Sequence, residues 1–224
     1  LAAARGEWPA ASPDNLRYAL LAGVLGVSGP NLLGFSALTH LPAGLVGAFI
    51  ALSPVFTYLF ALAFRLEGAR ATGILGIVLG FAGALALARP SAAPLPGGTA
   101  LLWILPAIAT PLMLAGANLY RSMAWPSGLK PLSAAALMLA LQAILVVPAA
   151  SAAGDILRPA SAGTAGLLAV LAAGGLMAAF YLSAFELQRR AGPVLVGQLG
   201  NVIAVASLVI GVLLLGERYS PGTL

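Results

Sequence analysis

Residues 164–187 read TAGLLAVLAAGGLMAAFYLSAFEL, a run in which Glu186, near its end, is the single charged side chain. A helix that crosses the hydrocarbon core of a bilayer needs about 20 consecutive, mostly apolar residues. The run is continuous rather than alternating between apolar and polar residues, so it does not indicate a β-strand. It therefore predicts a transmembrane α-helix.

Similar runs occur along the whole chain. The predicted spans are residues 18–39, 43–64, 71–88, 100–120, 132–150, 164–187 and 194–215. Of the 224 residues, 61% are hydrophobic and 8% are charged, whereas soluble domains carry about 25% charged residues. The sequence thus predicts an all-α fold, a polytopic transmembrane helical bundle with seven spans.

Composition also excludes several classes of chemistry. The chain has no cysteine and one histidine, His40, so thiolate metal sites and histidine clusters are not available. We expect no metal and no cofactor. The net charge of +5 comes from 11 basic residues spread over short loops rather than gathered in a patch, so we expect no nucleic-acid partner.

The basic residues instead indicate orientation, because cytoplasmic loops of membrane proteins are enriched in lysine and arginine. The N-terminal segment and every second loop after it carry eight of them, and the other side carries three: Arg5, Arg17, Arg65, Arg70, Arg121, Lys130, Arg189 and Arg190, against Arg89, Arg158 and Arg218. The sequence therefore places the N-terminal segment in the cytoplasm.

An internal repeat relates the first two spans to the last two. Leu45-Val46-Gly47 and Leu195-Val196-Gly197 begin matching spans, and Glu67 and Glu217 follow them at the same offset of 150 residues. Matching spans lie five crossings apart, an odd number, so the two copies would be inverted. Inverted repeats are typical of secondary transporters, whose substrate site lies between the halves.

Several short motifs resemble one transporter family. They are ALTHLPA at residues 37–43, LSPVFT at 52–57, Glu67, and the glycine-rich stretch 76–83. Together they are similar to the first EamA repeat of the drug/metabolite transporter superfamily. GERYSP at 216–221 resembles the second glutamate junction, although Ile203-Ala204 stands where the Ser-Pro pair would be.

The resemblance implies ten helices in two inverted five-helix repeats, of which this chain would hold helices three to nine. Residues 1–94 would be a partial first repeat with three spans, and residues 95–224 a partial second repeat with four. We therefore expect a fragment of a longer parent. The implied function is that of a secondary transporter, not an enzyme. The resemblance implies export or uptake of amino-acid-like or drug-like metabolites across the bacterial inner membrane by alternating access, and of the two we expect export.

Polar residues inside the apolar spans are the candidate substrate contacts, because each needs a partner or water in the membrane. Ser53 and Thr57 are four residues apart on one helix face, and Gln198 and Asn201 are three apart on another. The alternative role for each is helix-to-helix hydrogen bonding. The predicted substrate-binding residues are Asn31, Ser53, Thr57, Tyr58, Tyr181, Gln198 and Asn201.

Prolines inside the spans remove backbone hydrogen bonds and bend helices. The candidate gating or kink positions are Pro30, Pro54, Pro106 and Pro111. The fourth span also carries Thr110 and Asn118, which are not among the predicted binding residues. The series Gly73, Gly76, Gly80 and Gly83 has helical spacing and predicts a smooth face for close packing.

Two other functions remain open. Gly26-Val27-Ser28-Gly29 matches the GxSG pattern of rhomboid-type intramembrane serine proteases, but His40 lies twelve residues on, or about 18 Å along a helix. A non-catalytic membrane scaffold or subunit is the second alternative. The expected partners of a transporter are a small-molecule substrate and the lipid bilayer, with a homodimer left open.

Overall fold

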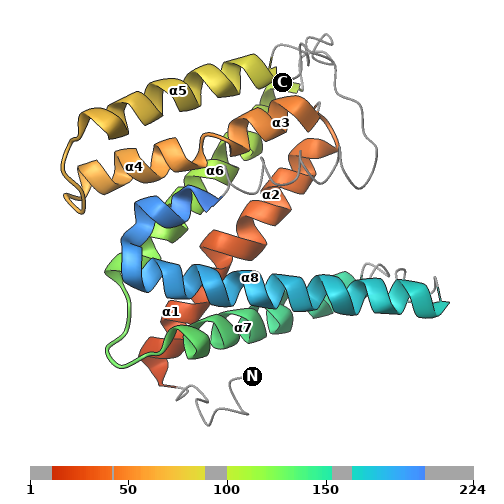
Figure 1. The fold of residues 1–224 in the computed structure, drawn as a ribbon. Coiled ribbons are helices and arrows are strands. Elements are labelled where there is room, and N and C mark those ends of the chain that lie inside the picture. Colours follow the sequence, from red (N-terminus) through yellow and green to blue (C-terminus); the bar gives the residue numbers. More distant parts are fainter. Residues whose placement is uncertain (1–11, 42, 89–99, 153–162, 200–224) are drawn as a thin grey trace. The chain divides into compact units, whose positions relative to one another are not determined.

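The computed structural model describes residues 12–41, 43–88, 100–152 and 163–199, and these are helical throughout apart from short turns, with no strand (Figure 1). Its elements are α1 (Pro13–Gly23), the π-helix η2 (Val24–Ser28), α2 (Gly29–Leu38), α3 (Ala43–Ile50), α4 (Ser53–Ala63), α5 (Ala71–Ala88), α6 (Ala100–Met123), α7 (Pro131–Ala152) and α8 (Gly163–Gly197). The prediction of an all-α fold is confirmed.

Five stretches within the described residues are long and apolar enough to cross a membrane. They are Pro13–Leu38, Leu45–Ala63, Leu102–Met123, Pro131–Pro148 and Gly163–Gly197. The protein is thus a multi-pass membrane protein with a polytopic helical fold, as predicted. The third predicted span coincides with α5, whose stretch Ala71–Gly80 is a shorter apolar helix. The seventh begins at residue 194 and lies mostly outside the described residues.

The chain forms two compact units, each assembled from segments far apart in sequence. Compact unit 1 comprises Leu1–Ser28 and Tyr120–Gly192, and compact unit 2 comprises Gly29–Leu119 and Pro193–Leu224. The predicted boundary between two repeats, after residue 94, falls in 89–99, outside the described residues, and stays a prediction.

In compact unit 1, α1 packs against α7 through small side chains. Ala19 and Ala22 of α1 and Ala134 and Ala135 of α7 are all fully buried in one core cluster. Alanines let helix backbones approach closely, which is how helices associate where lipid removes the hydrophobic driving force.

Gln142 of α7 lies in the same contact region, against the backbone of Gly23. A Cβ added at Gly23 would overlap the Gln142 side chain, and Gln142 is 5% exposed. Neither Nε2 nor Oε1 of Gln142 has a hydrogen-bond partner among the described residues. Packing against Gly23, rather than hydrogen bonding, is therefore what Gln142 contributes to this contact.

A Gln142→Met variant is expected to melt at the same temperature as the native protein or a few degrees higher. It keeps an unbranched side chain against Gly23 and removes a buried, unsatisfied amide, which costs about 1–3 kcal/mol. The matched control is Gln188→Met, because the equally buried Gln188 donates from Nε2 to Ser122 Oγ and should lose stability. Thermal melts in detergent measure both; a lower midpoint for Gln142→Met would contradict the prediction.

In compact unit 2, α5 packs against α3 and α4, and α4 and α5 run side by side, joined by a short turn (Figure 1). The predicted glycine face is used only in part. A Cβ added at Gly73 or Gly80 would overlap Tyr58 or Val55 of α4, whereas one at Gly76 would meet open space. Gly73 and Gly80 are seven residues apart on one face, and that face makes the close contact.

The second predicted span consists of two helices. Because Pro54 has no N–H, the α-helical ladder is interrupted there: Leu52 N donates to Phe49 O in a tight turn (3.0 Å), and α4 starts at Ser53. The first span is also irregular, since the π-helix η2 directly precedes Gly29-Pro30. Single π-helical turns inside α-helices are frequent at functional sites.

Helix α4 ends in a six-residue hydrogen-bonded motif around Arg65. The Arg65 N–H donates to Leu62 O (3.0 Å) and the Leu66 N–H to Ala61 O (2.8 Å). This motif requires a left-handed residue and usually uses glycine, yet Arg65 occupies it with φ 58°. A left-handed conformation costs a non-glycine residue about 1–2 kcal/mol, so the turn holds a strained arginine.

A break divides α8 near its C-terminal end. Gly192 has φ 78° and ψ −175°, a conformation essentially confined to glycine, and Pro193 follows. Just before the break, Arg190 Nε donates to Glu186 Oε1 across one exposed helical turn (2.6 Å). The break separates the sixth predicted span from the start of the seventh.

Candidate functional site

Helix α4 carries the first two polar groups of the candidate site, Ser53 and Thr57. Both are buried, and Thr57 is 0% exposed. The Thr57 hydroxyl donates to the Ser53 carbonyl oxygen at 2.8 Å, a bond within the helix that satisfies its proton. The oxygen of Thr57 keeps acceptor capacity for another helix, since a hydroxyl has two lone pairs.

A side chain of helix α6 donates a hydrogen bond to this hydroxyl oxygen. The Asn118 side chain donates from Nδ2 to Thr57 Oγ1 at 3.2 Å, across 61 residues of sequence. Asn118 is 6% exposed, so the bond is sealed inside compact unit 2. Buried polar groups are costly unless they are hydrogen-bonded, and this bond links α4 to α6 where most neighbouring side chains are apolar.

The C-terminal end of α8 approaches the same point. A Cβ added at Gly197 would lie 3.2 Å from Thr57 Oγ1 and 3.3 Å from Thr57 Cβ. Such a contact is tighter than most Cβ contacts, so a side chain at position 197 would require Thr57 or the α8 backbone to shift by a few tenths of an ångström. We call Thr57, Asn118 and Gly197 the Thr57 cluster; it brings together three helical segments of compact unit 2.

Gln198 follows the cluster directly. Its backbone N–H donates to Leu195 O at 3.1 Å, and its side chain is exposed. Asn201, its predicted neighbour on the same helix face, lies outside the described residues. The predicted pairing of Gln198 with Asn201 therefore stays a prediction.

The Tyr58 hydroxyl is engaged by the turn between α4 and α5. It accepts a hydrogen bond from the Arg70 backbone N–H (3.1 Å) and donates to the Gly68 carbonyl oxygen (3.4 Å). The ring is 7% exposed. In this structure Tyr58 has the partners expected of a packed aromatic residue that fixes a turn.

Two predicted binding residues are not members of the Thr57 cluster. Asn31 of α2 is exposed in compact unit 2, next to the buried Pro30. Tyr181 of α8 belongs to compact unit 1, where it is half-buried and contacts Phe180 edge to face, with ring centroids 5.3 Å apart. Within compact unit 2, the structure brings Ser53 and Thr57 together.

The candidate kink prolines differ in their surroundings. Pro54 is the second residue of α4, and Pro30 is the second residue of α2, which directly follows the π-helix. Helix α6, in contrast, continues through both Pro106 and Pro111. Near them, the buried Thr110 donates to the Pro106 carbonyl oxygen at 2.9 Å, so its hydroxyl is bonded within its own helix.

Sequence reasoning predicted neither Gly197 nor Asn118 as a site residue, and the polar member that it missed is Asn118. Its polarity inside an apolar span was visible, but its partner on α4 was not. The only signal was that an amide is rarely left without a partner inside a membrane protein. That rule predicts that a partner exists without saying which residue it is.

The structure also describes His40, the base of the alternative protease, and the residue types that could bind a metal. His40 stacks on Trp103 with ring centroids 3.7 Å apart, and its Nδ1 lies 2.7 Å from Thr39 Oγ1. Within the part of the chain that the structure describes, no three His, Cys, Asp or Glu side chains gather into a possible metal site.

Comparison with known proteins found a family match for the N-terminal part of the chain. Residues 1–89, which include α1 to α5, match the EamA-like transporter family. No curated protein matches the chain. The match covers the motifs at residues 37–43 and 52–57 and Glu67, so the resemblance that these motifs carry is confirmed. Residues 1–89 of this membrane protein are therefore similar to the EamA-like transporter family.

Proposed function

We propose that the protein is a secondary transporter of the bacterial inner membrane that exports small metabolites by alternating access. The EamA-like domain and the apolar helices support a membrane transporter as the general function. The N-terminal segment would lie in the cytoplasm, as the distribution of basic residues favours. Amino-acid-like or drug-like solutes are the proposed substrates.

The observation that carries the proposal is the buried hydrogen bond from Asn118 to Thr57. It is a neutral bond between an amide and a hydroxyl, and Gly197 beside it leaves no side chain in the way. Neutral polar groups suit an uncharged or zwitterionic solute better than a phosphate, which usually recruits arginine or lysine. The cluster would bind the solute by exchanging this bond for bonds to it.

The same bond suits alternating access. It joins α4 to α6, and the C-terminal end of α8 packs beside it, so a small shift of one of these segments breaks it. In an apolar interior, the freed amide and hydroxyl then need a new partner. A bound solute supplies that partner, and this couples occupancy of the cluster to its conformation.

The export of an unidentified solute tests the proposal. Untargeted mass spectrometry compares the medium of cells expressing native protein, Thr57→Val or Thr110→Val. Valine keeps the shape of threonine and removes the hydroxyl. Thr110 is the matched control because its hydroxyl bonds within α6. We expect export to fall about tenfold in Thr57→Val, the effect of about 1.4 kcal/mol, and to persist in Thr110→Val.

The outcomes separate the parts of the proposal. If no solute accumulates outside cells whose membranes contain the native protein, the proposal that the protein is an exporter is wrong. If Thr57→Val exports as well as the native protein, transport stands and the Thr57 cluster is not the site. Equal losses in both variants would show that a threonine hydroxyl supports folding rather than binding.

A further inference from the structure

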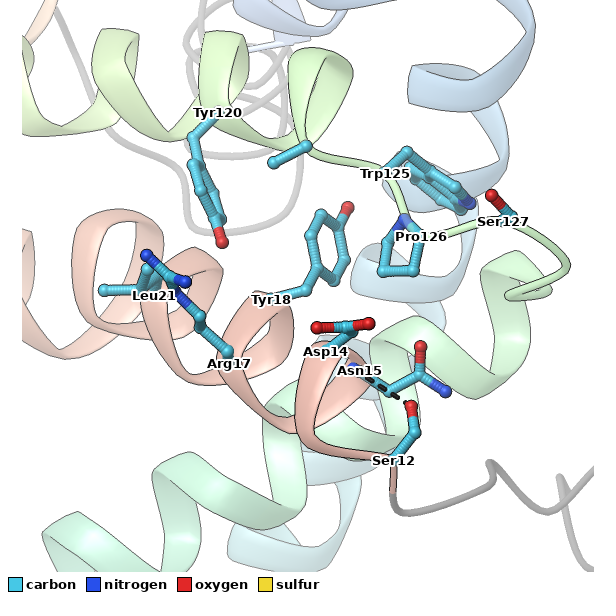
Figure 2. Close-up of a pocket in the computed structure, with 11 residues that line it drawn as sticks. Ser12, Asp14, Asn15, Arg17, Tyr18, Leu21, Tyr120, Trp125, Pro126 and Ser127 are labelled. Atoms are coloured by element: carbon cyan, nitrogen blue, oxygen red, sulfur yellow. Dashed lines mark hydrogen bonds between the residues drawn. The ribbon is translucent and has the colours of Figure 1, made fainter.

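Compact unit 1 contains a pocket that shares no residue with the Thr57 cluster. It has a volume of about 540 Å³ and lies between the N-terminal turns of α1 and the C-terminal end of α6 with its following loop (Figure 2). Pockets that take small molecules measure about 300–1,000 Å³. We call it the aromatic pocket; its main lining residues are Ser12, Asp14, Arg17, Tyr18, Tyr120 and Trp125.

Three aromatic rings form its wall, and each is held in place. Tyr18 stacks on Tyr120 with ring centroids 5.8 Å apart, and it contacts Trp125 at 5.7 Å. The Tyr18 hydroxyl donates to the Arg121 carbonyl oxygen (3.3 Å), and Trp125 Nε1 donates to Leu129 O (2.9 Å). Such a wall is preorganised, so a ligand does not have to order it.

Two opposite charges stand beside this wall. Asp14 and Arg17 are three residues apart on α1, so they share a helix face, and both side chains are exposed. In Figure 2 the Arg17 side chain extends toward Leu21, and the Asp14 carboxylate lies below the Tyr18 ring. Neither forms an ion pair with a described residue, so both charges are available to a ligand.

We propose that the aromatic pocket binds a zwitterion that carries a flat or apolar group. The ammonium group would pair with the exposed Asp14 carboxylate and the anionic group with Arg17. The flat group would lie against Tyr120 and Trp125, which are partly exposed, whereas Tyr18 is buried behind them and supports them. An aromatic wall alone would accept uncharged solutes; the paired charges select the zwitterion.

The position of the pocket indicates its role. Arg17, Arg121 and Lys130 belong to the side of the membrane that is predicted to be cytoplasmic from the distribution of basic residues. The pocket would therefore be a cytoplasmic loading site, a second site besides the Thr57 cluster. This role and the choice of substrate class rest on the proposed function, whereas binding itself can be measured without transport.

Equilibrium binding of radiolabelled phenylalanine to the purified protein in lipid nanodiscs tests the proposal. We expect Asp14→Asn and Arg17→Gln each to weaken binding about fivefold, the effect of a partly screened charge contact. Glu186→Gln is the matched control, because it removes an exposed charge on α8 that pairs with Arg190. Thr57→Val alters only the Thr57 cluster, in the other compact unit, so the binding that depends on Asp14 and Arg17 should persist in it.

Two competitors add a second readout. Phenethylamine lacks the carboxylate and 3-phenylpropionate lacks the ammonium, so each should compete at least fivefold less well than phenylalanine. Equal competition by either compound, or no binding of phenylalanine at millimolar concentration, would overturn the zwitterion site. Binding that is lost in Thr57→Val and kept in Asp14→Asn would overturn it too, while supporting the Thr57 cluster. If the native protein binds phenylalanine but exports no solute, the zwitterion site stands and the proposed function is wrong.

Discussion

Export by a Gly197→Leu variant is expected to fall below about one-tenth of the native rate. The Cβ of any residue at position 197 would already lie 3.2 Å from Thr57 Oγ1, and leucine adds three more carbon atoms to that contact. Overpacking of this kind costs about 1–3 kcal/mol, and 1.4 kcal/mol is a factor of ten in rate. The exported solute, measured in the medium, gives the rate.

A graded series and a control sharpen this prediction. Gly197→Ala should lose less export than Gly197→Leu, because its single added carbon can be accommodated by a shift of a few tenths of an ångström. Gly174→Leu, on an exposed part of α8 where an added Cβ meets nothing within 4 Å, should export normally. Normal export by Gly197→Leu would show that the approach of α8 to Thr57 is not needed for transport.

The second large effect concerns stability. A Gly73→Ala variant is expected to unfold at a clearly lower temperature than the native protein, because its methyl group overlaps the Tyr58 ring. The ring cannot move aside freely, since its hydroxyl is bonded to both Gly68 and Arg70. We expect a loss of about 1–3 kcal/mol, read as the midpoint of a thermal melt in detergent.

Two further variants isolate the cause. Gly76→Ala lies one helical turn along α5 in open space, so it should gain helix propensity of up to about 1 kcal/mol and melt no lower than the native protein. In a Tyr58→Ala background, Gly73→Ala should lose its penalty, because the overlapping ring is gone. A penalty that persists in that background would assign the effect to α5 itself rather than to its contact with α4.

Much of the fold could be predicted because membrane-spanning helices are recognisable in a sequence as long, continuous apolar stretches. Every predicted span that falls within the described residues contains helix, including α5, α6 and α7. The finer breaks were not predictable to the residue. Pro54 indicated an irregularity in the second span, but the turn that separates α3 from α4 lies just before it, at residues 51–52.

The candidate site was predictable only in part, for a physical reason. The spacing of Ser53 and Thr57 follows from helix periodicity, which the sequence carries directly. The pairing of Thr57 with Asn118 depends on how α4 packs against α6, and local periodicity holds no information on that packing. The glycines of α5 are a second example of a feature that could be predicted only in part. Their helical spacing is visible in the sequence, but the rotation of α5 about its own axis decides that Gly73 and Gly80 are the two that face α4.

The strained turn at Arg65 has a consequence for how the protein is made. Glycine would relieve the left-handed backbone at this position, but it would remove one of the eight basic residues on the side proposed to be cytoplasmic. Charge flanking a span acts during insertion, before the turn exists, whereas the backbone penalty is felt only in the finished fold. On the proposed topology, Arg65 serves membrane insertion at the expense of the mature structure, and glycine at position 65 would be a more stable residue but a poorer topogenic signal.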